Sequence, residues 1–242
     1  MRLIFLLMLL IVPLKGPKMT GSLDIPAATL HGIDVSHHQK NIDWKTVARR
    51  HDVQFAFVKA TEGGDFKDSL FAENWGMLQE LGIRRGAYHF FRPNGSGYQQ
   101  AQHFLQTVTL SPGDLAPVLD LETTDNVPKA VMLEQARVWL QTIERNLNVQ
   151  PIIYTNQDFY ERHLAGVFDN YPLWIARYSD KMPELGRDKK WQFWQYSDKG
   201  AVDGIKNCVD INIFWGTPSM LDRYCWFPAE GLPQPLEAGV AP

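Results

Sequence analysis

The chain has 242 residues, of which 45% are hydrophobic and 12% aromatic, so it can bury a large apolar core. Its net charge of -3 provides no basic surface for nucleic acid and no polybasic patch for acidic lipids. We therefore expect a globular, monomeric protein without a nucleic-acid partner.

An apolar segment opens the chain. Met1-Arg2 precede residues 3–14, which are all apolar, and Lys15 follows them. About twelve apolar residues suit the core of a signal peptide and fall short of the roughly 20 that span a bilayer as a helix. We expect residues 1–26 to be a signal peptide, or an uncleaved anchor with its linker. The protein is then exported, periplasmic or secreted, and any membrane contact is made through this segment.

From residue 31 the chain alternates strand-like and helix-like segments, the pattern of a parallel α/β domain. Strands are expected at residues 31–36, 54–60, 85–91, 115–122, 151–154, 173–178, 191–196 and 209–215. Helices are expected at residues 43–50, 68–82, 98–108, 129–147 and 157–164. Between residues 179 and 207 the connecting segments are polar and show no helical periodicity.

Eight strands are the number that closes a small barrel with a filled interior, and closure removes both sheet edges. The expected fold is therefore α/β, a single TIM-like (β/α) barrel of eight strands and about five helices. It should occupy residues 27–225, and a Pro- and Gly-rich tail should follow at residues 226–242.

The fourth expected strand ends in a pair of carboxylates. Side chains alternate between the two faces of a strand, so Asp120 and Glu122 share one face while Leu119 and Leu121 share the other. In a cleft, desolvation and mutual repulsion would keep one of the two acids protonated near neutral pH. Such a group is suited to general acid catalysis.

Other strand ends carry side chains that can bind or react, and in barrels of this kind the active site lies at those ends. Reading them in order gives Asp34, Glu62, Tyr88, His89, Tyr154, Arg177, Tyr178, Gln195 and Tyr196, with Trp174 inside the sixth strand and Asp210 at the beginning of the eighth. Acids together with flat aromatic rings describe a cleft for carbohydrate. Structural roles are the alternative for single members, because Glu62 can pair with Lys59 and Trp174 can fill the barrel.

Histidine and cysteine give no sign of a metal site or another cofactor. The seven histidines lack the spacing of metal ligands. In an exported protein Cys208 and Cys225 can form a disulfide, but two free thiols fit the sequence equally well.

In their order along the chain, the motifs from His31 to about Thr217 resemble those of the lysozymes of glycoside hydrolase family 25, which are N-acetylmuramidases. The matching motifs are Gly32-Ile33-Asp34-Val35-Ser36, Phe57-Val58-Lys59-Ala60-Thr61-Glu62-Gly63-Gly64-Asp65-Phe66-Lys67-Asp68, Gly86-Ala87-Tyr88-His89-Phe90, Val118-Leu119-Asp120-Leu121-Glu122, Ile153-Tyr154-Thr155, Leu173-Trp174-Ile175-Ala176-Arg177-Tyr178 and Val209-Asp210-Ile211-Asn212-Ile213-Phe214. Lys40 departs from the family's usual residues in the first loop.

The resemblance implies a flattened eight-stranded barrel that hydrolyses the bond between N-acetylmuramic acid and N-acetylglucosamine in peptidoglycan glycan strands. It implies that Glu122 is the proton donor and Asp120 its partner, with Asp34 and Asp210 as the remaining acids. The other strand-end residues are then expected to bind substrate.

The spacing of Asp120 and Glu122 bears on mechanism. Two positions along one strand separate their Cα atoms by about 6.5 to 7 Å, so both acids approach the bond from one side. This suits substrate assistance by the sugar's acetamido group, with net retention of configuration, better than a protein nucleophile or an inverting base.

Two alternatives compete with this interpretation. A chitinase-like barrel would need acids at positions 115 and 118, where Leu115 and Val118 stand. A non-catalytic peptidoglycan-binding protein of the same fold is the other alternative, and the retention of all four acids argues against it.

Overall fold

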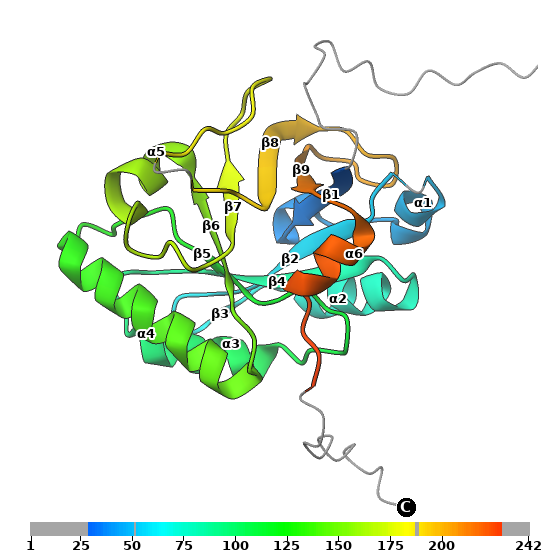
Figure 1. Ribbon diagram of the computed structural model, residues 1–242. Helices are drawn as coiled ribbons and strands as arrows, with labels where there is room; N and C mark the ends of the chain where they lie inside the picture. The colour runs from blue at the N-terminus through cyan, green and yellow to red at the C-terminus, as the bar shows by residue number, and fades with distance from the viewer. Residues whose placement is uncertain (1–28, 51, 187–188, 229–242) are drawn as a thin grey trace, which may run out of the picture.

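The computed structural model describes residues 29–50, 52–186 and 189–228, and in these residues one sheet closes into an eight-stranded barrel (Figure 1). The barrel strands are β1 (Thr29–Val35), β2 (Phe55–Glu62), β4 (Arg84–Phe90), β5 (Val118–Asp120), β6 (Ile152–Asn156), β7 (Leu173–Ala176), β8 (Phe193–Gly200) and β9 (Val209–Trp215). The short strand β3 (Phe66–Lys67) forms a hairpin with β2 outside the ring. The eight predicted strands and the barrel are thus confirmed.

The strand order around the ring is β1-β9-β8-β7-β6-β5-β4-β2, and β1 pairs with β2 to close it. All neighbours are parallel except β9, which runs antiparallel to both β8 and β1. An antiparallel pair needs no crossover helix. This explains why the polar residues 201–208 connect β8 directly to β9; the parallel pair β7 and β8 is also joined without a helix among the described residues of 177–192.

The described residues contain six α-helices, one more than predicted. They are α1 (Trp44–Arg49), α2 (Phe71–Glu80), α3 (Gly97–Thr107), α4 (Lys129–Leu147), α5 (Gln157–Phe159) and α6 (Pro218–Leu221). The π-helical turn η2 (Tyr160–Leu164) extends α5, and short 3-10 turns occur at η1 (His37–Gln39) and η3 (Asp222–Tyr224). Helices α1 to α4 lie on the outside of the barrel (Figure 1). The additional helix, α6, is a single turn capped by Thr217, too short to show a periodic pattern.

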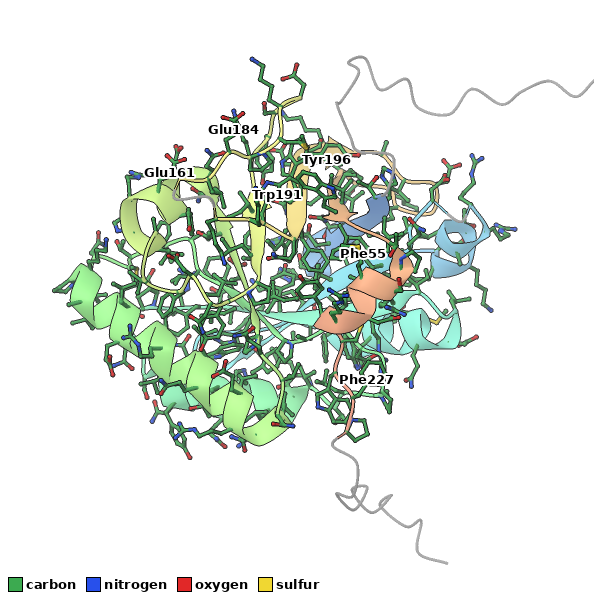
Figure 2. The ribbon with its side chains drawn as sticks, viewed as in Figure 1. Phe55, Glu161, Glu184, Trp191, Tyr196 and Phe227 are labelled. Atoms are coloured by element: carbon green, nitrogen blue, oxygen red, sulfur yellow. The ribbon has the colours of Figure 1, made fainter. Side chains whose placement is uncertain are left out.

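Alternation along the strands divides the core into two layers. In β2, Phe55 and Phe57 point into the barrel, whereas Ala56 and Val58 pack against the helices. Phe55 lies near the centre of the molecule in Figure 2. Aromatic side chains dominate the barrel filling, namely Phe55, Phe57, Trp174, Phe193 and Phe214.

Strand β5 is shorter than the predicted strand at residues 115–122. Leu115 makes an isolated bridge to Cys225, and Pro117 cannot donate a ladder hydrogen bond. After Asp120 the backbone stays aligned, because the Leu121 amide donates to the Tyr154 carbonyl at 2.9 Å. Glu122 therefore lies just beyond the strand end rather than within the strand.

The structure also bears on the expectations for the two cysteines, the C-terminal tail and the N-terminal segment. Cys208 is exposed, Cys225 is buried, and both are free thiols. Trp226 donates its indole N–H to the Leu147 carbonyl at 2.8 Å, while residues 1–26 and most of the tail lie outside the described residues. Within the described part of the chain, no helix has the length and hydropathy needed to cross a membrane.

Gly86 provides a test of the barrel filling. A Cβ atom there would lie 2.5 Å from the Phe57 ring and 3.0 Å from the Leu115 Cβ. We predict that Gly86→Ala lowers the free energy of unfolding by about 1–3 kcal/mol, as overpacking does. At Gly76, in α2, a Cβ would meet nothing within 4 Å, so Gly76→Ala should instead stabilise by about 0.5–1 kcal/mol. Urea unfolding measures both, and equal stability of the two variants would contradict this packing.

Candidate active site

The structure brings the four predicted acids together in one cavity of about 270 Å³ at the mouth of the barrel, where the parallel strands end. The lining residues are Asp34, Ser36, His38, Lys59, Tyr88, Phe90, Asp120, Glu122, Tyr154, Trp174, Tyr178, Gln195 and Asp210. They include the predicted binding residues Tyr88, Tyr154, Trp174, Tyr178 and Gln195, whereas Glu62, His89, Arg177 and Tyr196 lie elsewhere. Within the described ranges, no group of three or more His, Cys, Asp or Glu residues is arranged to hold a metal ion.

Asp34 and Asp210 face each other across β1 and β9, where they are direct partners in the antiparallel register. Asp34 is buried, and its Oδ2 accepts hydrogen bonds from Gln195 Nε2 at 2.8 Å and Asn212 Nδ2 at 2.7 Å. Burial, together with the charge of Asp210, raises the pKa of Asp34 well above its usual range. Burial also raises the pKa of Asp210, although a hydrogen bond shared with Asp34 opposes the rise.

Gln195 connects Asp34 to two aromatic hydroxyls. Its Oε1 accepts from Tyr154 at 2.9 Å and from Tyr178 at 3.0 Å, while its Nε2 donates to Asp34. Asn212 acts similarly, because its Oδ1 accepts the Trp174 indole N–H at 2.8 Å. Both amides are buried with their orientation fixed by partners on each side, so the network holds the Asp34 carboxyl in one position.

Asp120 and Glu122 form the second pair of acids. Asp120 is buried, and burial together with the charge of Glu122 raises its pKa well above the usual range. Its Oδ1 atom is buried without a hydrogen-bond partner among the described residues. Glu122 is half-buried, and burial and the charge of Asp210 raise its pKa. The Lys59 ammonium lowers the pKa of both acids and limits each rise.

Glu62 lies outside the cavity and holds Lys59 in it. Its Oε2 accepts from the Lys59 ammonium at 2.6 Å, and its Oε1 accepts from Arg92 Nε at 3.0 Å. Although burial opposes the effect, these hydrogen bonds lower the pKa of Glu62. The ion pair considered from the sequence is therefore present, and Glu62 does not line the cavity.

His89 and Tyr196 also do not line the cavity, because they lie on the outer face of their strands. In β4 the side chain of Tyr88 points into the mouth, so its neighbour His89 points toward the helices. His89 is fully buried there, stacks on Trp139 at 5.6 Å, and burial lowers its pKa to about 3. Tyr196 packs against Trp194 in the outer core layer. The prediction that both residues bind substrate in this cleft is corrected accordingly.

Asn212 and Lys59 are functional candidates that the sequence did not single out. Asn212 lies two positions after Asp210 in β9, so the same alternation that places Asp210 at the mouth also turns Asn212 into the barrel. Lys59 follows Phe57 on the inner face of β2 by the same rule. Applying the alternation to every strand end would have found both residues.

A second hollow of about 610 Å³ adjoins the cavity that contains the four acids, called the acid cavity below, and shares Glu122, Tyr154 and Tyr178 with it. Its other lining residues are Asn156, Gln157, Asp158, Ala176 and Arg177. Arg177, predicted as a binding residue, thus lies beside the acid cavity instead of inside it. The two hollows together make a mouth that is longer than the acid cavity alone.

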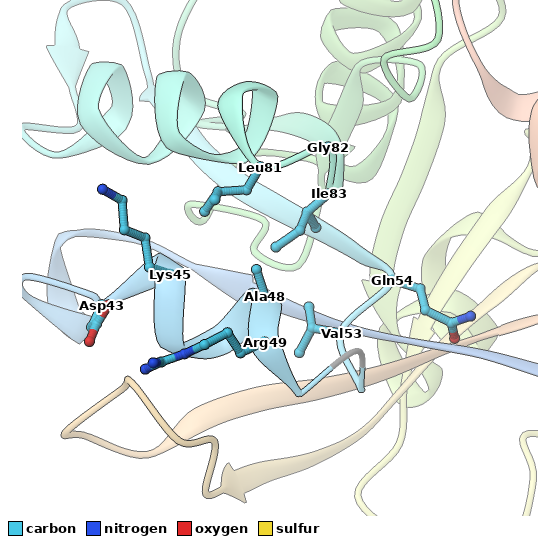
Figure 3. A pocket seen from close by; sticks show the side chains of 9 residues that line it. All are labelled: Asp43, Lys45, Ala48, Arg49, Val53, Gln54, Leu81, Gly82 and Ile83. Carbon is cyan, nitrogen blue, oxygen red and sulfur yellow. The ribbon is translucent and has the colours of Figure 1, made fainter.

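A larger hollow of about 1060 Å³ lies on the outer surface between α1 and the end of α2 (Figure 3). Asp43 is the acid in its lining, and that carboxylate caps α1 by accepting from the Thr46 amide. Lys45 and Arg49 extend along its rim. This hollow is larger than the cavity with the four acids, yet it contains no pair of acids. Volume alone therefore does not identify the candidate active site.

Comparison with known proteins places the chain among carbohydrate-active enzymes. Residues 33–205 match the model of the glycosyl hydrolases family 25. YegX of Escherichia coli K12, an uncharacterized protein, is 43% identical over 213 residues, covering 86% of this chain and 78% of its own. Lysozyme M1 of Streptomyces globisporus is 34% identical, covering 81% of this chain and 72% of its own. The solved structure of a family 25 glycosyl hydrolase from Bacillus anthracis superposes with a TM-score of 0.78 at 30% identity, covering 86% of this chain and 99% of its own.

The raised pKa of Asp34 predicts how stability depends on pH. An unfolded aspartic acid releases its proton near pH 4, whereas burial keeps Asp34 protonated to higher pH. The folded state then binds more protons than the unfolded state, so stability falls as pH rises from about 4 through the folded pKa. Asn cannot ionise, so Asp34→Asn lacks this loss of stability with rising pH. Relative to wild type, its free energy of unfolding should rise from pH 4 to pH 8 by more than the ~0.5 kcal/mol of an ordinary surface change.

Urea unfolding at the two pH values measures this difference. Asp65→Asn, at an exposed position, is the matched control and should show none. An Asp34→Asn difference that is the same at both pH values would refute the raised pKa.

Proposed function

Because the chain belongs to glycosyl hydrolase family 25, and is therefore a glycoside hydrolase that acts on peptidoglycan, we propose that it is a lysozyme with Glu122 as its proton donor. The bond cleaved is the β-1,4 bond between N-acetylmuramic acid and N-acetylglucosamine, with net retention. The observation that carries this proposal is the pair Asp120 and Glu122, one buried and one reachable, in a cavity with two further acids.

Glu122 has the properties required of the general acid. Burial and neighbouring charge raise its pKa, so that it holds a proton nearer to neutral pH than an ordinary glutamate does. It lines both hollows of the mouth. A sugar in either hollow can therefore present its glycosidic oxygen to the same carboxyl group.

Asp120 suits a supporting role toward the acetamido group. Its buried Oδ1 has no partner among the described residues, so it can accept the acetamido N–H of a bound sugar. A positive charge that develops on the sugar acts on Asp120 as Lys59 does and favours its ionised form. Asp120 then stabilises that charge.

The reaction proceeds in two steps. The acetamido oxygen attacks the anomeric carbon, the glycosidic bond breaks, and the Glu122 proton passes to the leaving oxygen. Water then attacks the anomeric carbon of the cyclic oxazolinium ion, and the Glu122 carboxylate takes a proton from that water. Two inversions at one carbon give net retention without a covalent bond to the protein.

The hydrogen bonds around Asp34 hold the wall of the cavity rigid, and the groups in this network do not react in either step. Asp34 and Asp210 close one wall of the cavity, and the rings of Tyr88 and Tyr154 line it beside the sugar. A preorganised wall orients the acetamido group before the first step.

Export follows from the substrate, because peptidoglycan lies outside the cytoplasm. The apolar residues 3–14 are the segment that we propose directs it. The mass of the mature protein distinguishes a removed signal from a retained anchor. A mature protein that stays in the cytoplasm with residues 1–26 intact would contradict this assignment.

Glu122→Gln tests the proton donor. The amide preserves the shape of the side chain but cannot supply the proton, so hydrolysis of purified peptidoglycan should fall by at least the roughly 10²- to 10⁴-fold typical of general acid catalysis. New reducing ends measure the rate. Glu134→Gln, on the exposed face of α4, should keep the wild-type rate. A Glu122→Gln rate within threefold of wild type would refute the assignment, and a wild-type protein that binds glycan without producing reducing ends would favour the non-catalytic alternative.

The stereochemistry of the product tests substrate assistance. Proton NMR at the start of the reaction should show the β-anomer of the new reducing sugar, because the bond cleaved is β. Initial formation of the α-anomer would rule out this mechanism and would make Asp34 or Asp210 the candidate base of an inverting reaction.

A further inference from the structure

The hollow that adjoins the acid cavity contains a cation whose charge is not matched by a nearby carboxylate. Arg177 lines this hollow together with Glu122 and Tyr178. Among the described residues, no Asp or Glu oxygen lies within 4.0 Å of its guanidinium. Asp158 lines the same hollow but is exposed to water and forms no ion pair with Arg177. Arg177 therefore keeps its charge available to a ligand.

The position of Arg177 is fixed by its own main chain. It directly follows β7, its amide donates to the Gln195 carbonyl at 3.0 Å, and its carbonyl accepts the Trp194 indole N–H at 2.8 Å. Nη1 donates to the Met182 carbonyl at 3.1 Å. A guanidinium has five N–H donors, so most of its fork is free for a planar anion. A carboxylate matches that fork by accepting two parallel hydrogen bonds.

The substrate carries its acid groups close to the bond that is cleaved. In peptidoglycan the muramic acid residue bears a 3-O-lactyl arm, which ends in a carboxylate in bare glycan and continues into an acidic stem peptide otherwise. Glu122 belongs to both hollows, so the sugar whose bond it protonates lies at their junction. An arm from that sugar can enter the hollow that contains Arg177.

We propose that Arg177 binds a carboxylate on the lactyl arm of muramic acid or on the stem peptide attached to it, and so distinguishes muramic acid from an uncharged sugar. This inference rests on the proposed lysozyme function. An ionised acid in the mouth would repel an anionic substrate, and Arg177 offsets that repulsion on the side where the arm projects. Arg177 therefore affects which substrate is selected and does not take part in bond cleavage.

Two matched pairs of substrates test the proposal. The first pair is peptide-free glycan strands with free lactyl carboxylates and the same strands with those carboxylates converted to methylamides. The second pair is stem-bearing strands whose glutamyl α-carboxylate is either free or amidated. For each pair the ratio of kcat/KM, charged over neutral, is measured through new reducing ends. Because both substrates meet the same enzyme sample, the ratio does not depend on how much of a variant is folded.

We expect the wild-type ratio to be about tenfold or more in the pair that carries the recognised carboxylate, as for a charge-assisted hydrogen bond. Arg177→Gln should bring that ratio to about one, and Arg177→Lys should retain part of it. Arg145→Gln removes an equal charge from the exposed face of α4 and should keep the wild-type ratio. The pair that responds identifies the source of the carboxylate.

Three results would overturn the proposal. A wild-type ratio near one in both pairs, or an unchanged ratio in Arg177→Gln, would refute carboxylate recognition while the lysozyme function stands. A wild-type enzyme that cleaves none of the four substrates would overturn the lysozyme function and this inference together.

Discussion

The contact between Asp34 and Asp210 depends on the direction of β9. Because β9 runs antiparallel to β1, the beginning of one strand lies beside the end of the other, and both acids reach the same mouth. Gln195 and Asn212 then hold the Asp34 carboxyl from two further positions. The cost of burying these acids is offset by the barrel that surrounds them, whose aromatic filling closes the space below the mouth. The raised pKa values, the shape of the cavity and the proposed chemistry all depend on this arrangement.

Strand positions and the acid cluster could be predicted from the sequence because both depend on patterns that local physics dictates. Buried parallel strands are continuous apolar runs, so residues 54–60 and 151–154 are recognisable from their residue types alone. Asp120 and Glu122 end such a run, and the rule that reactive groups lie at strand ends brings Asp34 to the same place. Asp210 reaches it from the beginning of β9, because that strand is antiparallel. The predicted absence of helices from the last third of the barrel follows equally from the polar connections there.

The direction in which each side chain points was harder to predict, because adjacent residues at a strand end point to opposite faces of the sheet. Tyr88 lines the cavity and His89 does not, although both lie near the end of β4. The pairing of Glu62 with Lys59 could be suspected from the sequence, but its second pairing with Arg92 and the burial that favours both over substrate contact could not. Tyr178 lines the acid cavity whereas its neighbour Arg177 lines only the adjoining hollow, a separation that no local sequence pattern contains.

The proposed chemistry requires that Glu122 keep its proton to a higher pH than an ordinary glutamate before substrate arrives. Carbon-13 NMR of protein labelled at the side-chain carboxyl carbons of Asp and Glu, titrated from pH 3 to pH 9, measures this most directly, with Glu122→Gln identifying the Glu122 signal. Glu122 should titrate above the usual glutamate pKa of about 4.3, and its curve should be coupled to that of a second carboxyl. A Glu122 signal that titrates alone at or below that value would contradict this requirement.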